Sequence, residues 1–303
     1  MSAQNDLFDR ELLRQRRARF AGALPDHDFL LRRAAEDIAG RVGAVLREFP
    51  LALDIGAQNG LLGRELRKLP SVGQVISADH CLPAIAQADP LRVICEEEQL
   101  PFADRCADLI VSNLALHLVN DLPGALIQIR HALKADGLFM GALLGGETLT
   151  ELRQALVEAE AETTGGASPR IAPFADVRDC GALLQRAEFA MPVSDSDLVE
   201  VTYASPIDLM REARAMGGGN ILRARSRQPL RRATLVRAVE IYCERFPAGG
   251  GRVRATFEII HLTGWAPGPG QPKPLRPGSA KTRLADALGV EEQSAGERAN
   301  PKK

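Results

Sequence analysis

The chain has 303 residues, of which 45% are hydrophobic and 25% charged, and its formal net charge at pH 7 is −1. This composition is typical of a globular protein with a sizeable core, and the near-neutral charge gives no general attraction for nucleic acid or acidic membranes. The cysteines are widely spread and form no CxxC pair, which argues against a zinc knuckle or a disulfide framework. The histidines show no metal-ligand spacing, so the sequence predicts no metal site.

The compartment is predicted from apolar runs and from the first residues. No apolar run approaches the roughly 20 residues that a membrane-spanning helix needs. Asp6, Asp9 and Glu11 are atypical of an organelle transit sequence, which avoids acids. We therefore expect a cytoplasmic protein without stable membrane insertion. The mitochondrial matrix is the alternative for a eukaryotic chain, although no transit peptide is visible.

Residues 1–48 are predicted to form a helical arm. Phe8, Leu12 and Leu13 share one helical face, and apolar residues recur at helical period between 30 and 46. Four arginines lie between these two runs, at Arg14, Arg16, Arg17 and Arg19. Two interpretations of these arginines remain open: a solvated basic face, or a docking surface for an acidic partner such as a carrier protein.

Strand and helix patterns alternate between residues 49 and 145. Strands are predicted at 51–55, 74–79, 92–95, 107–112 and 138–144, and a helix at 121–133. The last of these strands is almost wholly apolar, as a strand buried on both faces should be. Such alternation predicts a parallel sheet with right-handed crossovers.

The pattern changes after residue 146. Helices are predicted at 149–162 and 175–186, a strand at 198–203, two helices at 206–216 and 230–246, and a strand at 256–265. We interpret 206–250 as a helical insertion between the last two strands of an α/β domain at 49–266. Proline, glycine and charge dominate residues 267–303, which predicts a mostly disordered tail.

A glycine-rich turn follows the first strand and precedes a helical pattern. Strand, tight turn and helix N-terminus form the arrangement that holds a nucleotide in doubly wound α/β folds. Gly56 and Gly60 can adopt backbone angles that other residues avoid, and they let a ligand approach the main chain. The first amides of the helix add a partial positive field. An ordinary turn has the same pattern, so neighbouring residues must decide.

The second strand ends in an acid, Asp79, about 20 residues beyond the glycine turn, which is the spacing of a nucleotide-binding fold. Its carboxylate could accept two hydrogen bonds from ribose hydroxyls. The alternative is an acid that caps the helix predicted to begin near Cys81. Because the glycine turn is present, the sequence favours ribose binding.

Further polar residues follow the third and fourth strands, at the same edge of the predicted sheet. Glu96 or Glu97 could accept a hydrogen bond from an adenine amino group, although a solvated charge cluster explains them equally well. Asn113 and His117 follow the fourth strand, and a neutral imidazole could orient or deprotonate an acceptor, while a packed histidine is the commoner case. No GxSxG elbow or P-loop occurs. A reaction that holds two substrates in line, with a reactive cofactor, fits this pattern.

Together these residues resemble motifs I to IV of class I S-adenosylmethionine-dependent methyltransferases. The matching positions are Asp54-x-Gly56-x-x-x-Gly60, Asp79, 96–102 and 107–113. Over residues 6–266 the chain is similar to the mitochondrial complex I assembly factor of the methyltransferase-like family and its bacterial relatives. This similarity lies in FDR at 8–10, FPLALD at 49–54, LHLVNDLP at 116–123, GGETL at 145–149, SPRIAPF at 168–174 and MG at 216–217. The malonyl-carrier-protein methyltransferase of biotin synthesis is a more distant relative.

The resemblance implies a Rossmann-like α/β fold, with a seven-stranded, mostly parallel sheet and helices on both faces. It implies that His117 lies on the acceptor side as the catalytic residue. It also implies S-adenosylmethionine as the cofactor, bound by Asp54, Gly56, Gln58, Gly60, Asp79, Glu96, Glu97 and Asn113.

Two functions follow from the resemblance. The first is methyl transfer to a carrier-bound acid or a protein side chain. The second is assembly of respiratory complex I, by binding or hydroxylating an arginine of one of its subunits, with a non-catalytic scaffold as a variant. The sequence shows no two-His-one-carboxylate iron site that would support hydroxylation.

Two residues depart from the family pattern. Gln58 stands where the family has the middle glycine of motif I, and Leu118 replaces the usual aromatic residue after His117. Gln58 adds a Cβ and an amide beside the expected cofactor tail. We therefore expect Gln58 to narrow the loop and weaken cofactor binding.

Overall fold

The computed structural model describes residues 6–271, 279 and 282–290. The chain divides into two units, Met1–Pro269 and Gly270–Lys303. The second unit contains a short helix, α10 (Leu284–Leu288). The tail predicted at 267–303 lies largely outside the described residues. Within the described part of the chain, no helix is long and apolar enough to cross a membrane.

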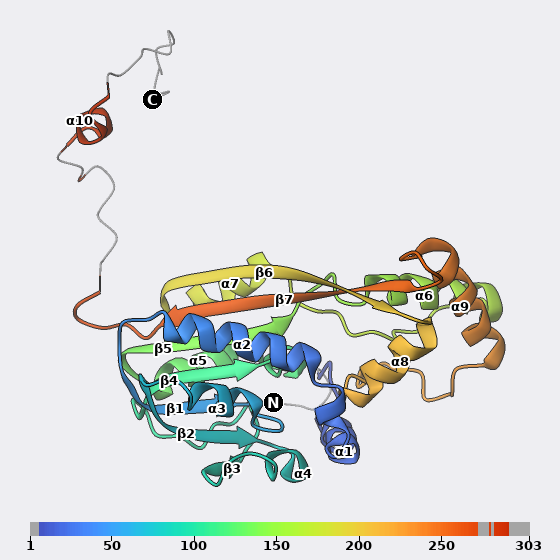
Figure 1. Ribbon diagram of the computed structural model, residues 1–303, viewed down its shortest axis with the longest axis horizontal. Coiled ribbons are helices and arrows are strands. Elements are labelled where there is room, and N and C mark those ends of the chain that lie inside the picture. Colours follow the sequence, from blue (N-terminus) through green and yellow to red (C-terminus); the bar gives the residue numbers. More distant parts are fainter. Residues whose placement is uncertain (1–5, 272–278, 280–281, 291–303) are drawn as a thin grey trace. The chain divides into compact units, whose positions relative to one another are not determined.

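A seven-stranded sheet, in the order β3-β2-β1-β4-β5-β7-β6, forms the centre of the first unit (Figure 1). Strand β7 runs antiparallel to both β5 and β6, while the remaining neighbours are parallel. The predicted seven-stranded, mostly parallel sheet is therefore confirmed. The strands are β1 (Phe49–Ile55), β2 (Val72–Asp79), β3 (Arg92–Ile94), β4 (Ala107–Asn113), β5 (Leu133–Leu144), β6 (Ala190–Tyr203) and β7 (Val253–Trp265).

Helices cover both faces of this sheet, because each face has its own hydrophobic core. Helices α2, α3, α6 and α9 contribute residues to one core, and helices α5 and α7 contribute residues to the other. The helices of this unit are α1 (Arg10–Phe20), α2 (Phe29–Gly43), α3 (Leu61–Leu66), α4 (Leu82–Ile85), α5 (Leu122–Ala132), α6 (Thr150–Thr164), α7 (Val177–Arg186), α8 (Pro206–Ala215) and α9 (Arg232–Arg245).

Polar side chains fix where several of these helices begin. Asp9 accepts a hydrogen bond from the amide of Leu12 at the start of α1, and Asp121 accepts one from Gly124 at the start of α5. Ser205 caps α8, whose first residue is a proline. Each cap satisfies an amide that has no partner within the helix, which explains why these boundaries agree with the sequence.

Strand β6 begins earlier than the sequence predicted, at Ala190 rather than at residue 198. It is an edge strand that pairs only with β7 in the described sheet, so many of its side chains face solvent. Asp195 and Asp197, which precede the predicted start of the strand, form ion pairs with Arg41 and Arg33 of α2, respectively. The two helices α8 and α9 follow β6 and precede β7.

Candidate functional site

The carboxyl ends of the parallel strands bring the predicted cofactor residues to one edge of the sheet. The glycine loop follows β1, Asp79 ends β2, Glu96 follows β3 and Asn113 ends β4. Helix α1 lies at the end toward which the arrowheads of β2 and β4 point (Figure 1). In doubly wound folds, ligands bind beyond this edge.

Three residues of the glycine loop have left-handed backbone angles, with φ of 69° at Gly56, 49° at Gln58 and 72° at Gly60. A Cβ at Gly56 would collide with the side chain of Ala115, and one at Gly60 would collide with Ala88. Both glycines therefore allow close packing of the protein on itself. Gln58 adopts the same left-handed backbone conformation although it has a side chain. This conformation costs free energy in a residue other than glycine.

The Gln58 side chain lies on the cavity side of the loop. Its backbone amide donates to Asp79 Oδ2 at 2.9 Å, and its side-chain amide donates to the carbonyl of Leu114 at 3.4 Å. The side chain also lines the cavity described below. That Gln58 narrows the loop and weakens cofactor binding stays a prediction.

Asp79 is fully buried. One carboxylate oxygen accepts the Gln58 amide, and the other accepts the amide of Cys81 at 2.7 Å. The guanidinium of Arg17, on α1, lies 3.5 Å from Oδ2. The carboxylate therefore joins the glycine loop, the turn that precedes α4 and the N-terminal helix.

Glu97 forms the second anchor of α1. It is 1% exposed and forms ion pairs with Arg10 and with Arg17, the latter at 3.5 Å. His80 Nδ1 lies 3.3 Å from Glu97 Oε2, the oxygen that also pairs with Arg10. Burial opposes ionisation, but the His80 hydrogen bond and the two arginine charges hold the pKa of Glu97 well below its usual range. Glu96, whose side chain is 42% exposed, also pairs with Arg10.

The chemistry of these carboxylates fits the cofactor that the fold implies, because they could accept hydrogen bonds from ribose hydroxyls and an adenine amino group. Arg10 and Arg17 of α1 lie against them in this arrangement. A ribose that reached Asp79 would have to displace Arg17. The ligand atoms of Asp79, His80 and Glu97 also lie within 4.8 Å of one another, and a metal ion there would have to displace the same two arginines.

Asp54 and Asn113 make contacts with the surrounding helices. Asp54 is fully buried and accepts the amide of Gly63, in α3, at 3.2 Å. Burial, with a smaller repulsion from Asp79, raises the pKa of Asp54 to about 7. The Asn113 amide donates to the carbonyl of Leu31, in α2, at 2.8 Å. Their assignment to the cofactor remains a prediction.

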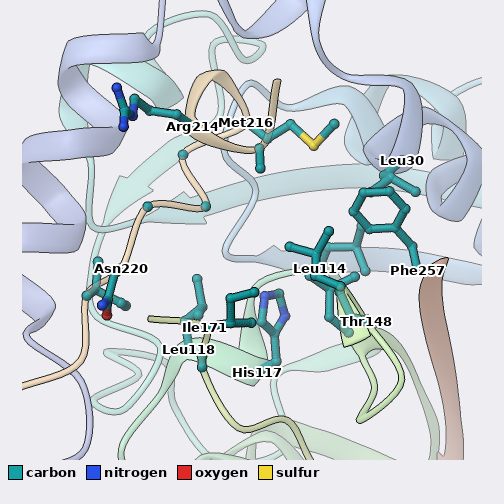
Figure 2. Close-up of a pocket in the computed structure, with 18 of the residues that line it drawn as sticks. Leu30, Leu114, His117, Leu118, Thr148, Ile171, Arg214, Met216, Asn220 and Phe257 are labelled. Atoms are coloured by element: carbon teal, nitrogen blue, oxygen red, sulfur yellow. The ribbon is translucent and has the colours of Figure 1, made fainter. Parts of the chain in front are cut away.

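A cavity of about 260 Å³ lies between the carboxyl edge of the sheet and the helices around it (Figure 2). Its walls are mostly apolar, and none of the described residues that line it is aspartate or glutamate. Three arginines line it: Arg17 is paired with Asp79 and Glu97, and Arg170 with Glu160 at 2.6 Å, while no salt bridge is seen for Arg214 among the described residues. The lining includes the apolar residues Leu30, Leu114, Leu118, Ile171, Met216 and Phe257, and the polar residues Gln58, His117 and Arg214.

His117 lies in the cavity wall, in the short 3-10 turn after β4. Its ring makes an edge-to-face contact with Phe174 at 5.5 Å between centroids, and its Nδ1 is buried without a hydrogen-bond partner. Burial, and then the charge of Arg17, lower the pKa of His117 to about 3. The imidazole is therefore neutral near pH 7, and its Nδ1 has no hydrogen-bond partner within the described protein.

Comparison with known proteins defines the family. Residues 53–141 match the methyltransferase domain family. The arginine-hydroxylase NDUFAF5 of Mus musculus is 40% identical over 289 residues, which cover 93% of this chain and 83% of that protein. The chain belongs to the NDUFAF5 family.

Two further relatives extend the comparison beyond NDUFAF5. The malonyl-(acyl-carrier protein) O-methyltransferase of Xylella fastidiosa is 32% identical over 272 residues, covering 87% of this chain and 90% of that protein. The YcgJ protein of Bacillus subtilis has a TM-score of 0.54 at 14% identity, and it covers 77% of this chain and 98% of that chain, which shows the fold alone. The resemblance to class I methyltransferases and to the complex I assembly factor family is thus confirmed.

The sequence did not predict that Arg10 and Arg17 belong to this site. The interpretation of the basic run as a solvated face or a docking surface is wrong for Arg17, which is 7% exposed and paired within the molecule. A signal was present in the spacing. Arg10 and Arg17 stand three residues before and four residues after the buried Leu13, so all three share one helical face.

Proposed function

We propose that this member of the NDUFAF5 family is an S-adenosylmethionine-dependent methyltransferase whose acceptor is a carrier-bound acid. The methyltransferase domain and the methyltransferase relative support the reaction class. The observation that supports the acceptor class is the cavity, which adjoins the glycine loop at Gln58 and contains cations but no acid among its described lining residues.

The cavity favours an anionic acceptor over a cationic one. A carboxylate on an apolar chain would find leucine walls for the chain and positive charge for the head group. A guanidinium in the same place would find no carboxylate, and an unpaired buried charge is costly. The described lining therefore suits an acyl acid better than an arginine side chain.

The roles of individual residues follow from their positions. Bound S-adenosylmethionine would supply an electrophilic methyl group. Asp79 would hold its ribose, Glu96 or Glu97 its adenine, and Gly56 and Gly60 its methionine end. A carboxylate acceptor is ionised near pH 7, so its oxygen attacks without loss of a proton, and His117 orients the acceptor through its free Nδ1 rather than acting as a base. The apolar walls exclude water from the transfer.

The test is methyl transfer to defined acceptors. The protein is incubated with isotopically labelled S-adenosylmethionine and with malonyl-carrier protein, unacylated carrier protein, or complex I subunit peptides that contain arginine. We expect a labelled methyl ester on the acylated carrier alone. If the cofactor binds but no carrier-bound acid gains label, the proposed acceptor class is wrong.

A second candidate function is action on an arginine of a complex I subunit, by binding or by hydroxylation. The 40% identity to a protein named arginine-hydroxylase NDUFAF5 favours it. So does the pair of buried carboxylates, Asp79 and Glu97, which already hold guanidinium groups of α1. If the protein has this second function, its partner is a complex I subunit, and it works in the compartment where complex I is assembled.

The two candidates are separated by affinity purification of the protein from its own cells, followed by mass spectrometry. Recovery of complex I subunits with an arginine heavier by one oxygen atom would favour the second candidate. Recovery of acyl-carrier protein without such subunits would favour the first.

A further inference from the structure

Three arginines from distant parts of the chain gather beside the cavity. Arg16 lies on α1, Arg214 on α8, and Arg225 in the segment that connects α8 to α9. The positive charge of Arg225, and to a smaller extent that of Arg214, repels the charge of Arg16. Arg214 and Gly219 line the cavity, and a Cβ at Gly219 would collide with the Arg16 guanidinium. The cluster therefore lies next to the cavity wall.

The cluster has too little negative charge around it. Arg225 donates a hydrogen bond to Asp9 Oδ2 at 3.1 Å. The same carboxylate is the one whose negative charge attracts Arg16, so two arginines share it. Arg16 Nη1 is buried without a hydrogen-bond partner. The guanidinium of Arg214, an exposed residue, makes no hydrogen bond or ion pair with any residue in the described ranges. Burial first, and then the two neighbouring arginines, lower the pKa of Arg16. A bound oxyanion would relieve both the repulsion and the unmet donor.

Figure 2 shows how Arg214 is directed. Its side chain extends away from the side of the cavity that holds His117 and Leu114, whereas the neighbouring Met216 lies nearer to that apolar region. The positive charge is thus separated from the apolar interior. A ligand that filled both places would have an apolar segment in the cavity and an anionic group beside Arg214.

We propose that Arg16 and Arg214, with Arg225 beside them, bind a phosphate group on the arm that carries the acceptor acid. Arginine suits this task because its planar fork of donors matches phosphate oxygens. The phosphate binds these arginines, while the acyl end lies in the cavity with its carboxylate toward His117 and Arg17, which also line it. This inference rests on the proposed function, because it assumes a carrier-bound acceptor.

The test compares two acceptor fragments that differ only in the phosphate, malonyl-phosphopantetheine and malonyl-pantetheine. Each is titrated calorimetrically into the full chain. We expect the phosphorylated fragment to bind about ten-fold more tightly, the effect of one charge-assisted hydrogen bond. In the double variant Arg16→Gln/Arg214→Gln the ratio of the two affinities should fall to about one, while Arg16→Lys/Arg214→Lys should keep part of it. Arg19→Gln, an exposed change on the same helix, should keep the full ratio.

The outcomes separate this inference from the proposed function. If wild-type protein binds and methylates both fragments equally well, the phosphate site is wrong and the proposed function stands. If it neither binds nor methylates either fragment, both are wrong. If inorganic phosphate alone binds the arginines as tightly as the phosphorylated fragment does, the site is one for free phosphate and its assignment to the acceptor is wrong.

Discussion

Asp54 illustrates how one buried acid makes the stability of this fold depend on pH. Its pKa is raised to about 7 in the folded protein, so at pH 8 the fold carries a buried charge that the unfolded chain exposes to water. Below the ordinary pKa of aspartate the carboxyl group is protonated in both the folded and the unfolded chain, so its burial costs no stability. The folded state loses stability as the pH rises from there through the raised pKa of about 7.

We therefore expect Asp54→Asn to stabilise the protein at pH 8. An asparagine oxygen can still accept the amide of Gly63, while the buried charge is removed. The gain in the free energy of unfolding is at most about 4 kcal/mol, from about 1.4 kcal/mol per pKa unit. Urea unfolding between pH 5 and 8 measures it, and the advantage should shrink toward pH 5. A variant that is less stable than wild type at pH 8 would contradict the assignment.

Gln58 is the residue where the sequence departs from its family in the glycine loop. We expect Gln58→Gly to bind S-adenosylmethionine more tightly than wild type, because it removes a side chain from the loop and suits the φ of 49°. Gln58→Ala is the control, since it shortens the side chain but keeps the Cβ. Calorimetric titration of the three proteins decides, and equal affinity of wild type and Gln58→Gly would show that Gln58 does not narrow the site.

Helix α1 closes the carboxyl edge of the sheet through ion pairs of Arg10 and Arg17 with acids that the sequence had assigned to the cofactor. A ligand that binds only after such an ion pair has broken has a lower apparent affinity. Its affinity is reduced because only the small fraction of molecules with the pair broken can bind it. The two interpretations of the acids left open by the sequence were adenine binding and a solvated cluster. The structure adds a third, an anchor for the N-terminal helix.

We expect Arg17→Gln to have opposite effects on stability and on cofactor affinity. The free energy of unfolding should fall by about 3 kcal/mol, because Asp79 and Glu97 lose a buried partner. The affinity for S-adenosylmethionine should rise, because ribose no longer competes with the guanidinium.

Urea unfolding and calorimetric titration supply these two measurements, and Arg19→Gln, on an exposed residue of the same helix, is the matched control. The stability loss should diminish as the pH falls below the ordinary pKa of glutamate, where the charge of Glu97 in the unfolded chain is lost. An unchanged or lower cofactor affinity in Arg17→Gln would show that α1 does not compete with the cofactor.

The elements that the sequence predicted well are those with strong periodicity and clear boundaries. The strands before and after the glycine loop follow their apolar runs, and α5 and α8 begin at their capping residues. Strand β6 was predicted too short because its residues before 198 include Pro192, Asp195 and Asp197, which normally weaken a strand. Its position at the sheet edge, and ion pairs to α2, make those residues acceptable.

For the molecule as a whole, the sequence predicted the sheet and the edge where chemistry would lie, because both depend on local patterns. It did not predict the cavity, whose walls come from α1, α2, α6 and α8 and from the loops between them. Nor did it predict that His117 would have an unusually low pKa, since burial depends on contacts with distant segments such as Phe174. Tertiary packing, rather than any motif, determines the shape and charge of the cavity.

The proposed methyltransferase activity requires cofactor binding at the end of β2. The measurement that tests it is calorimetric titration of the full chain with S-adenosylmethionine, in wild type and in Asp79→Asn, with circular dichroism to confirm that both are folded. We predict saturable binding by wild type and at least about a ten-fold loss in the variant, because a neutral amide accepts ribose hydrogen bonds more weakly than a carboxylate. Absence of binding by wild type, or equal affinity of the two proteins, would contradict the proposed methyltransferase.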